Sequence, residues 1–366
     1  MFWTTQNVWC ILLDLVQKVQ SQSPKINNQA TLEGIDFYND YGLNSIQLVE
    51  LASYVNSFFH FLDVVQAPNL LNNPSIDSWV QKILAVRLEN DEYVSFQSSG
   101  TSGNSKLVSH SVESINCEVA FLQSILKKPK RILSFVPSNH IYGFLFTVVL
   151  PQIWNIPVVK VSQLEKLFFQ NDDLIIATPF NWQFVYSSFN NKEIKCAGIS
   201  SGSPLNDTLY MRLEKMGITI TEIFGSTETG GVGYRNISKN PFSLFSYWSF
   251  MEDGSSIFRL YDQTQYQLMD HIILEGDAYF KIKSRIDHVV QIGGINVSLD
   301  TVQEKIQSIK TVKTATVFAK ANGSGILIGA TIVLIKNEDE ERTICIQEMY
   351  TILEPIEVPN NIIFLD

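Results

Sequence analysis

The first part of the chain, residues 1–85, has apolar residues at helical spacing. Three segments, 8–19, 45–59 and 76–86, are each predicted to form a helix. In the second segment, the positions i, i+3, i+4 and i+7 define one buried face, occupied by Leu48, Leu51, Ala52 and Val55. Polar loops separate the three segments, so this region is predicted to be a small helical bundle.

From Tyr93 onward, short β-rich runs alternate with helical segments, which is typical of an α/β sheet. The predicted strands cover 93–96, 131–136, 174–177 and 218–223. After Arg285 we expect a smaller unit with a hairpin around Gly293 and Gly294 and a helix near 301–308. Its other strands are predicted near 314–319 and 326–335.

The predicted fold class is therefore a multidomain α/β protein. It divides into a helical domain (1–88), an α/β core (89–285) and a small, mobile α+β domain (286–366).

Composition narrows the range of partners. The 366 residues carry a net charge of −10, which argues against nucleic acid or an anionic membrane as a partner. No apolar run reaches the length of a membrane span. Residues 1–15 lack a basic start and a cleavage site, so they are interpreted as a first helix rather than a signal peptide. The four cysteines have neither metal nor disulfide spacing, which indicates a reduced, cytoplasmic chain.

A run rich in hydroxyls and glycines follows the first predicted strand. It comprises Ser98, Ser99, Gly100, Thr101, Ser102, Gly103, Asn104, Ser105 and Lys106. Glycines let the backbone approach an anion, while hydroxyls and a lysine donate hydrogen bonds to its oxygens. The Walker A spacing is absent, because Lys106 precedes Leu107. The run resembles the phosphate loop of adenylate-forming enzymes, the superfamily of acyl-CoA synthetases and nonribosomal-peptide adenylation domains.

Two further segments match this family but are weak signals alone. Segment 137–144 resembles a motif whose histidine, here His140, lines the acyl pocket near the substrate carboxylate. Taken alone, His140 is a polar residue at a strand end. Segment 200–205 resembles the loop that packs against adenine, which assigns that role to Gly202 and Ser203. As an isolated motif it is indistinguishable from a turn.

The most specific segment is 222–231, which follows the predicted strand 218–223. It is therefore expected at the carboxyl end of a strand, where open α/β sheets build their sites. The resemblance implies that Phe224 and Gly225 lie near the adenine and that Thr227 bonds the α-phosphate. It also implies that Glu228 reaches Mg²⁺, a cation that prefers hard carboxylate oxygens.

Two aspartates compete for the ribose hydroxyls, which the family binds through an aspartate with an arginine downstream. Asp270 lies fifteen residues before Arg285, and Asp277 lies eight before it. The longer gap leaves room for a hairpin over 272–283 with its turn at 275–277, so we expect Asp270 and Arg285 to act together. Asp287 matches the family's hinge, about which the small domain rotates between the two half-reactions.

The segment around Ser45 resembles the attachment site of acyl and peptidyl carrier proteins, where a serine carries 4′-phosphopantetheine. Its core reads Gly42, Leu43, Asn44, Ser45, Ile46. A helix start favours a phosphodiester through its unpaired N–H groups and positive dipole end. Asn44 replaces the family's usual aspartate. The alternative is that Asn44 or Ser45 simply caps the helix.

Three features qualify the resemblance. The segment between the helical region and the phosphate loop is much shorter than in full-length relatives, which implies a compact catalytic domain. The family continues beyond the position of Asp366 into a loop whose lysine contacts the adenylate. Without that lysine we expect slow adenylation, unless Lys106 compensates, while thioester transfer survives. Segment 137–144 has no aspartate to hold an α-amine, so an aryl or fatty acid is favoured over an amino acid.

The resemblance implies an enzyme that uses ATP and Mg²⁺ to activate a carboxylic acid as an acyl-adenylate. A thiol then takes the acyl group as a thioester. The leading hypothesis sends it to phosphopantetheine on Ser45, which makes a phosphopantetheinyl transferase and downstream synthase enzymes the expected partners. A second hypothesis sends it to CoA or a separate carrier. A third is a non-catalytic carrier and nucleotide-binding module.

Overall fold

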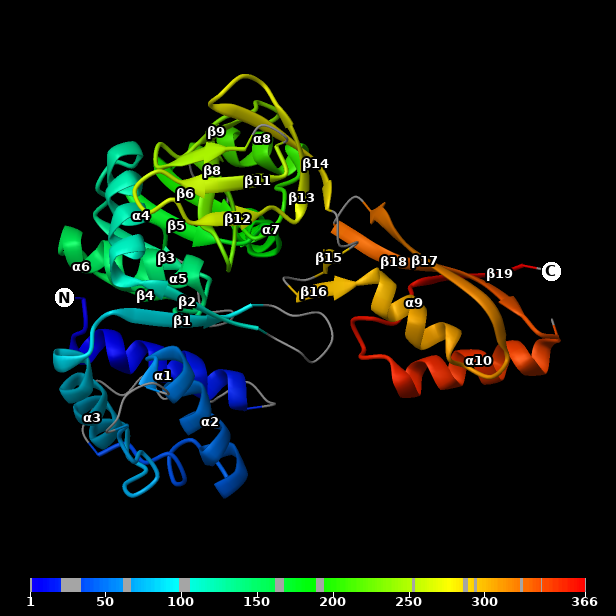
Figure 1. Cartoon of the computed structure of the whole chain (residues 1–366), viewed down its shortest axis with the longest axis horizontal. Coiled ribbons are helices and arrows are strands. Elements are labelled where there is room, and N and C mark those ends of the chain that lie inside the picture. The colour runs from blue at the N-terminus through cyan, green and yellow to red at the C-terminus, as the bar shows by residue number, and fades with distance from the viewer. Residues whose placement is uncertain are drawn as a thin grey trace. The chain divides into compact units, whose positions relative to one another are not determined.

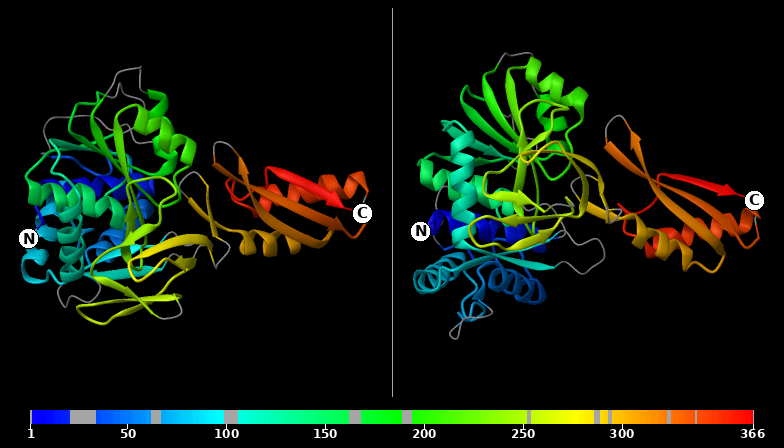
Figure 2. Two further views of the ribbon diagram at one scale, coloured as in Figure 1. Left: turned by 90° about the horizontal axis from the view of Figure 1, so that it is seen from above. Right: turned by 45° about the horizontal axis from the view of Figure 1, so that its top comes forward.

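A computed structural model describes residues 2–20, 34–61, 67–98, 106–161, 168–188, 194–251, 254–285, 289–292, 295–322, 325–336 and 338–365. The chain forms two compact units (Figures 1 and 2). Unit 1 takes residues 1–98, 107–240 and 245–247. Unit 2 includes residues 241–244 and 248–366. No described helix is long and apolar enough to cross a membrane.

Unit 1 begins with the three helices expected from the apolar pattern. They are α1 (Thr5–Val19), α2 (Ser45–Phe58) and α3 (Ile76–Glu89). Each begins at a polar N-cap whose side chain accepts a backbone N–H from the first turn, which satisfies a donor that the helix leaves open. The caps are Thr4, Asn44 and Ser75. These three helix predictions are confirmed.

The central sheet of unit 1 follows the order β4, β3, β5, β6, β7, β8. Its first five strands run parallel and β8 is antiparallel to β7. The bounds are β3 (Arg131–Ser134), β4 (Val158–Lys160), β5 (Asp173–Ala177), β6 (Cys196–Ser201), β7 (Ile218–Ser226) and β8 (Gly230–Arg235). The α/β prediction is confirmed, but β7 runs three residues beyond the expected strand 218–223 because it continues into a hairpin with β8.

Helices connect the strands of this sheet and cover it (Figure 1). They are α4 (Val112–Ile125), α5 (Ile141–Phe144), a π-helical turn η2 (Leu145–Val149), α6 (Leu150–Trp154), α7 (Pro179–Ser188) and α8 (Asp207–Lys215). One face of the sheet packs on α7 and α8 through a core that includes Trp182, Leu209 and Leu213.

A separate hairpin lies between the three N-terminal helices and the central sheet (Figure 1). It consists of β1 (Tyr93–Gln97) and β2 (Leu107–Ser111), which pair from Tyr93 opposite Ser111 to Gln97 opposite Leu107. The predicted strand 93–96 is therefore confirmed. Most of the predicted phosphate loop, residues 99–105, lies outside the described residues.

An aromatic cluster joins the N-terminal helices to the α/β part of unit 1. The ring of Phe144, in α5, lies 5.5 Å from Phe2, 5.7 Å from Trp3, 5.9 Å from Phe58 and 5.5 Å from Phe96, measured between centroids. All five side chains are buried. The helical segment and the sheet thus share one hydrophobic core. A division of this unit at residue 88 stays a prediction.

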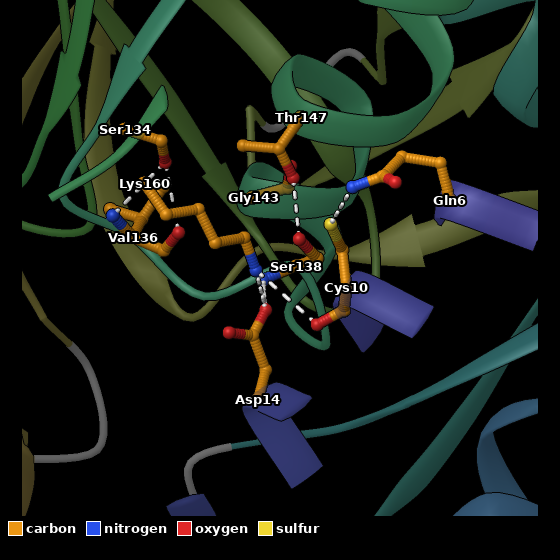
Figure 3. A network of polar contacts seen from close by, with 9 residues as sticks. All are labelled: Gln6, Cys10, Asp14, Ser134, Val136, Ser138, Gly143, Thr147 and Lys160. Atoms are coloured by element: carbon orange, nitrogen blue, oxygen red, sulfur yellow. Dashed lines mark hydrogen bonds and ion pairs between the residues drawn. The ribbon is translucent and has the colours of Figure 1, made fainter. Parts of the chain in front are cut away.

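Polar contacts add a second connection between α1 and the sheet (Figure 3). Asp14 is buried, accepts the Ser138 N–H at 2.5 Å and forms an ion pair with Lys160 of β4. The Ser138 hydroxyl lies 2.7 Å from that of Thr147, which donates to the Gly143 carbonyl at 2.7 Å. Helix α1 is therefore tied to the loop that leads to His140.

Unit 2 is rich in antiparallel strands. Its first part contains β9 (Phe242–Leu244), β10 (Trp248–Phe250), β11 (Ser256–Arg259), β12 (Gln265–Gln267), β13 (Asp270–Leu274) and β14 (Tyr279–Arg285). The order β10, β11, β12 forms one small sheet, while β14 pairs with both β13 and β9. The hairpin predicted over 272–283 is confirmed, with its turn at residues 275–278.

The last part of unit 2 is an α+β arrangement with its own core. It contains β15 (Val289–Ile292), β16 (Ile295–Ser298), α9 (Leu299–Gln307), β17 (Val312–Asn322), β18 (Gly325–Leu334), α10 (Asp339–Ile352) and β19 (Asn361–Leu365). Strands β15 and β16 form the hairpin predicted around Gly293, and α9, β17 and β18 also match the predictions. Buried residues such as Val302, Ile328 and Met349 fill the core.

Candidate active site

The hairpin between β7 and β8 carries the most specific motif. Strand β7 is buried from Ile220 to Ile223, then Phe224 and Gly225 are half-buried and Ser226 is exposed. The turn is only three residues long, Thr227 to Thr229. Thr227 is half-buried and Glu228 is exposed. The structure therefore presents the Glu228 carboxylate to solvent at the tip of a short, rigid turn.

Hydroxyl groups hold this turn in shape. The Ser226 Oγ accepts the N–H groups of Glu228 and Thr229, each at 3.2 Å. The Thr229 Oγ1 accepts the Ser226 N–H at 3.1 Å and donates to the Gly230 carbonyl at 2.8 Å. These local bonds explain why the motif needs hydroxyl residues on both sides of Glu228, because each caps backbone groups that a three-residue turn cannot pair.

Two residues that the sequence reasoning missed support the turn from outside. The imidazole Nε2 of the buried His110, on β2, lies 2.7 Å from the Thr227 carbonyl oxygen. The buried Glu118, on α4, accepts the Gly231 N–H at 2.9 Å. Burial raises the Glu118 pKa to about 7, against the lowering effect of the Gly231 N–H. A polar residue on the apolar face of a helix is the only sequence signal for Glu118.

The adenine-loop candidates lie at the same edge of the sheet as this motif. Strands β6 and β7 are parallel, and Ser201 pairs opposite Ile223. Gly202 and Ser203 directly follow the end of β6, and Phe224 directly follows the buried part of β7. The three residues therefore lie at the same edge of the sheet. Gly202 has a φ of +98°, which favours glycine, and it lets the chain turn sharply at the strand end. The structure thus brings together the residues predicted to contact the adenine.

A buried ion pair fixes this edge. Glu222 of β7 accepts the Leu205 N–H at 3.0 Å and pairs with Arg235 of β8 at 2.7 Å. It connects the loop after β6 with both strands of the hairpin. The sequence reasoning named Glu222 only as the start of the motif, and its anchoring contacts depend on the tertiary fold.

His140 occupies the N-cap position of α5, directly after the loop that Asp14 holds. Its side chain is exposed to solvent, yet the surrounding protein lowers its pKa by desolvation, and the charge of Lys18 lowers it further while Asp14 opposes the shift. A neutral, exposed imidazole beside α1 suits a residue that lines a pocket rather than an ion pair.

The remaining nucleotide candidates fall in other parts of the chain. Lys106 is exposed and immediately precedes β2, whereas Ser99, Gly100, Thr101, Ser102 and Gly103 lie outside the described residues. In unit 2, Asp270 and Arg285 are direct partners across the β13–β14 hairpin. Asp277 lies in the turn at the opposite end of that hairpin. The predicted pairing of Asp270 with Arg285 therefore holds, while Asp287 lies outside the described residues.

Ser45 begins α2 and is exposed. Asn44 is the residue that caps the helix, since it accepts the Gln47 N–H at 2.9 Å while the Gln47 side chain accepts the Asn44 N–H at 3.0 Å. The next turn exposes Ile46 and Val49, at 77% and 55% of their surface. The capping alternative thus applies to Asn44 and leaves the role of Ser45 untested.

A metal-binding role for Glu228 can be tested against the donor set. In the part of the chain that the structure describes, no three His, Cys, Asp or Glu side chains gather to hold a metal. Mg²⁺ does not require such a cluster, because it commonly binds one or two carboxylates together with substrate phosphates. The single exposed carboxylate of Glu228 fits that mode.

Comparisons with known proteins show which proteins this chain resembles. No family model matches the chain. A protein from Halorhodospira halophila named 4-coumarate–CoA ligase is 26% identical over 307 residues, which cover 82% of this chain and 78% of the relative. Ligases of the same name from Rhodobacter capsulatus and Cereibacter sphaeroides are 28% and 29% identical, and this chain covers 72% and 69% of them. The chain therefore resembles CoA ligases over most of its length.

Solved structures share the fold of this chain. An o-succinylbenzoate CoA synthetase from Bacillus subtilis has a TM-score of 0.58 at 17% identity, over 75% of this chain and 66% of the synthetase. A malonyl-CoA ligase with bound methylmalonyl-CoA and AMP has a TM-score of 0.56 at 14% identity, over 74% and 70%. The chain spans slightly less than two thirds of the synthetase. An enzyme of the adenylate-forming class, as predicted, is confirmed.

Proposed function

We propose that the protein is an ATP-dependent ligase that joins a carboxylic acid to the thiol of CoA. The carboxylate attacks the α-phosphate of ATP and releases pyrophosphate, which leaves an acyl-adenylate. The thiolate then attacks the acyl carbonyl, and AMP leaves as the thioester forms. The observation that carries this proposal is the exposed Thr227–Glu228 turn at the carboxyl edge of the sheet, in a chain whose relatives are named CoA ligases.

The proposed roles follow the resemblance to adenylate-forming enzymes. Thr227 and Lys106 donate to the phosphoryl oxygens as charge develops there. Glu228 would hold Mg²⁺, which neutralises phosphate charge when bound. Gly202, Ser203, Phe224 and Gly225 would contact the adenine, and Asp270 with Arg285 the ribose. Residues 99–103 would complete the phosphate site, and Asp287 the hinge.

We further propose an aryl carboxylic acid as the substrate class. The relatives are named for 4-coumarate, an aromatic acid. Desolvation lowers the pKa of His140, which favours the uncharged imidazole for contact with an aromatic acyl group. An aryl acid agrees with the absence of an aspartate in segment 137–144 that would hold an α-amine.

The test is formation of acyl-CoA by the purified chain with ATP, Mg²⁺, CoA and a panel of aryl, fatty and amino acids, followed by mass spectrometry. We expect thioesters of aryl acids, formed with release of AMP. Glu228→Gln and Thr227→Ala should each lower turnover by about 10- to 100-fold. The matched control, Glu214→Gln on the exposed face of α8, should leave it unchanged. Free acids and intact ATP throughout the panel would contradict the proposal.

A second acceptor is favoured by one observation. Ser45 is exposed at the first position of α2, beside the exposed apolar residues Ile46 and Val49. This arrangement supports phosphopantetheine attachment within a carrier domain over 1–88. Intact-protein mass spectrometry after treatment with a phosphopantetheinyl transferase and CoA tests it. A gain of one phosphopantetheine that Ser45→Ala abolishes would support the carrier role, and an unchanged mass would end it.

The position of Ser45 bears on loading within one chain. The far end of α2 contacts the β1–β2 hairpin, where the His60 Nδ1 lies 2.9 Å from the Ser95 hydroxyl. A helix of 14 residues spans about 20 Å, so Ser45 lies about that far along α2 from the hairpin. An acyl group loaded in this way would have to be carried by the phosphopantetheine arm on Ser45, whereas CoA needs no such attachment.

A further inference from the structure

The Thr227–Glu228 turn is held by two buried side chains from elements distant in sequence. His110 contacts the Thr227 carbonyl oxygen at the start of the turn, at 2.7 Å. Glu118 accepts the Gly231 N–H just after it, at 2.9 Å. The turn is thus fixed at both ends, and its tip, with Glu228, stays exposed.

Close packing makes the Glu118 contact specific. A Cβ atom on Gly230 would lie 2.4 Å from the Glu118 Oε2, and one on Gly231 would lie 2.7 Å from its Oε1. The Phe245 ring covers Gly231 from another side, since that Cβ would lie 2.5 Å from its Cε2. The two glycines therefore let the backbone lie directly against a carboxyl group.

Resting on the proposed ligase function, we propose that Glu118 is a positioning residue that sets the affinity for Mg²⁺-bound ATP by fixing the backbone after the Thr227–Glu228 turn. Glu118 is nearly fully buried and contacts the motif through Gly231 rather than through substrate. Its two carboxyl oxygens lie close to the backbone of Gly230 and Gly231. A shift of Gly231 would move the turn, because only three residues separate β7 from β8.

The protonation state of Glu118 should change this contact. Burial raises its pKa to about 7, and the Gly231 N–H is the described group that opposes the shift. His110, at Thr227, and Tyr247, whose hydroxyl donates to the Gly231 carbonyl at 3.1 Å, also reach this hairpin, and the Glu222–Arg235 ion pair lies within it. A carboxylate accepts a stronger hydrogen bond from an N–H than a neutral acid does. The turn should therefore be held more firmly above pH 7 than below it.

Three variants separate positioning from packing. Glu118→Gln keeps an amide oxygen that can accept the Gly231 N–H but cannot titrate. Glu118→Ala removes the acceptor. The matched control is Glu113→Gln, an exposed glutamate in the first turn of the same helix. For each variant we would measure kcat and the KM for Mg²⁺–ATP from pH 6 to pH 8.5. Calorimetry would give the dissociation constant of Mg²⁺–ATP over the same range.

We expect Glu118→Ala to raise the KM and the dissociation constant for Mg²⁺–ATP by about tenfold with a smaller change in kcat. In the unaltered chain both constants should rise as pH falls below about 7. Glu118→Gln should restore affinity and remove this pH dependence. Unchanged affinity in Glu118→Ala, or the same pH profile in Glu118→Gln as in the unaltered chain, would overturn the inference. If Glu118→Ala does not fold, the pH profile of Glu118→Gln decides alone.

A spectroscopic measurement distinguishes this inference from the proposed function. With ¹⁵N-labelled glycine, the Gly231 amide should titrate near pH 7 in the unaltered chain and lose that titration in Glu118→Gln. If Mg²⁺–ATP binds and Gly231 titrates but no thioester forms, only the proposed function fails. If thioester forms without the titration or the affinity change, only this inference fails. No binding of Mg²⁺–ATP would overturn both.

Discussion

Glu118 also makes stability depend on pH. The ordinary pKa of a glutamate is 4.5, and burial raises that of Glu118 to about 7 in the folded chain. A raised pKa means that the folded state binds the proton more tightly than the unfolded state. Stability is then fully present below pH 4.5 and is lost as pH rises towards 7, by up to about 3 kcal/mol. Denaturant titrations between pH 5 and pH 8 should show this loss.

The variant Glu118→Gln provides the comparison for that loss. Its amide does not titrate, so its free energy of unfolding should stay nearly constant over the same pH range. Equal slopes in the two proteins would contradict the assignment of the loss to Glu118. The exposed Glu113→Gln variant should retain the slope of the unaltered chain.

Asp14 is a second buried carboxylate with a structural role. It holds the Ser138 N–H and the Lys160 ammonium (Figure 3). Asp14→Ala should cost about 3 kcal/mol of unfolding free energy, because it leaves a partly buried ammonium without its partner. The double variant Asp14→Leu/Lys160→Met should cost less than the sum of the single changes. Additive costs, measured by denaturant unfolding, would show that the pair contributes nothing.

At this scale, the sequence predicted residues that act within one local segment. The hairpin between Asp270 and Arg285 was predicted from the spacing of the two residues, and in the structure they lie opposite each other. His110 and Glu118 were missed because their partners lie 117 and 113 residues away, and no local pattern records such contacts. The Thr227–Glu228 segment was predicted from its own sequence to follow a strand. The contacts of His110 and Glu118 with this turn could be seen only in the fold.

Among the elements, α5 depends on one glycine. A Cβ on Gly143 would lie 1.8 Å from the Pro137 carbonyl oxygen, so the start of α5 can approach the preceding loop only without a side chain. Gly143→Ala should destabilise the protein by about 3 kcal/mol or more and displace His140. Gly276→Ala, which meets no atom within 4 Å but has a φ of +81°, should cost only about 1 kcal/mol. Similar melting temperatures for the two variants would contradict this explanation.

Most elements were predictable because their signals are local. Apolar spacing and capping residues defined α1, α2 and α3, and β-rich runs defined the parallel strands. The end of β7 was not predictable, since Phe224, Gly225 and Ser226 are not a typical strand sequence. They are extended because β8 pairs with them, and such pairing depends on the returning strand.

For the whole molecule, the three N-terminal helices should be required for the α/β part of unit 1 to remain soluble. Removing residues 1–89 would expose Phe96 and Phe144, which pack against Phe2, Trp3 and Phe58. We expect the shortened chain to aggregate or bind a hydrophobic dye. A soluble, monomeric fragment with an unchanged melting temperature would contradict this expectation and favour an independent helical domain.

The predicted domain boundaries stay a prediction, because the sequence indicates helices and strands more directly than it indicates compact units. The sequence changes from helical to β-rich patterns near residue 88. The structure agrees, because helices precede this point and strands follow it. Such a change in pattern indicates secondary structure only. The boundary of a compact unit depends instead on which side chains share a core. In unit 1 that core contains Trp3 and Phe58 from the helices and Phe144 from beyond the phosphate loop.

The aromatic cluster limits how this enzyme can exchange parts with its relatives. Phe144 ends the same short helix that His140 begins, so the segment bearing the proposed pocket residue is also packed against Phe2, Trp3 and Phe58. In a chimera with segment 137–150 from another ligase, the residue at position 144 would come from a protein in which it packs against different side chains. Recombination is therefore expected to succeed only when crossovers transfer the N-terminal helices and this segment together, so that the two regions are inherited as one module.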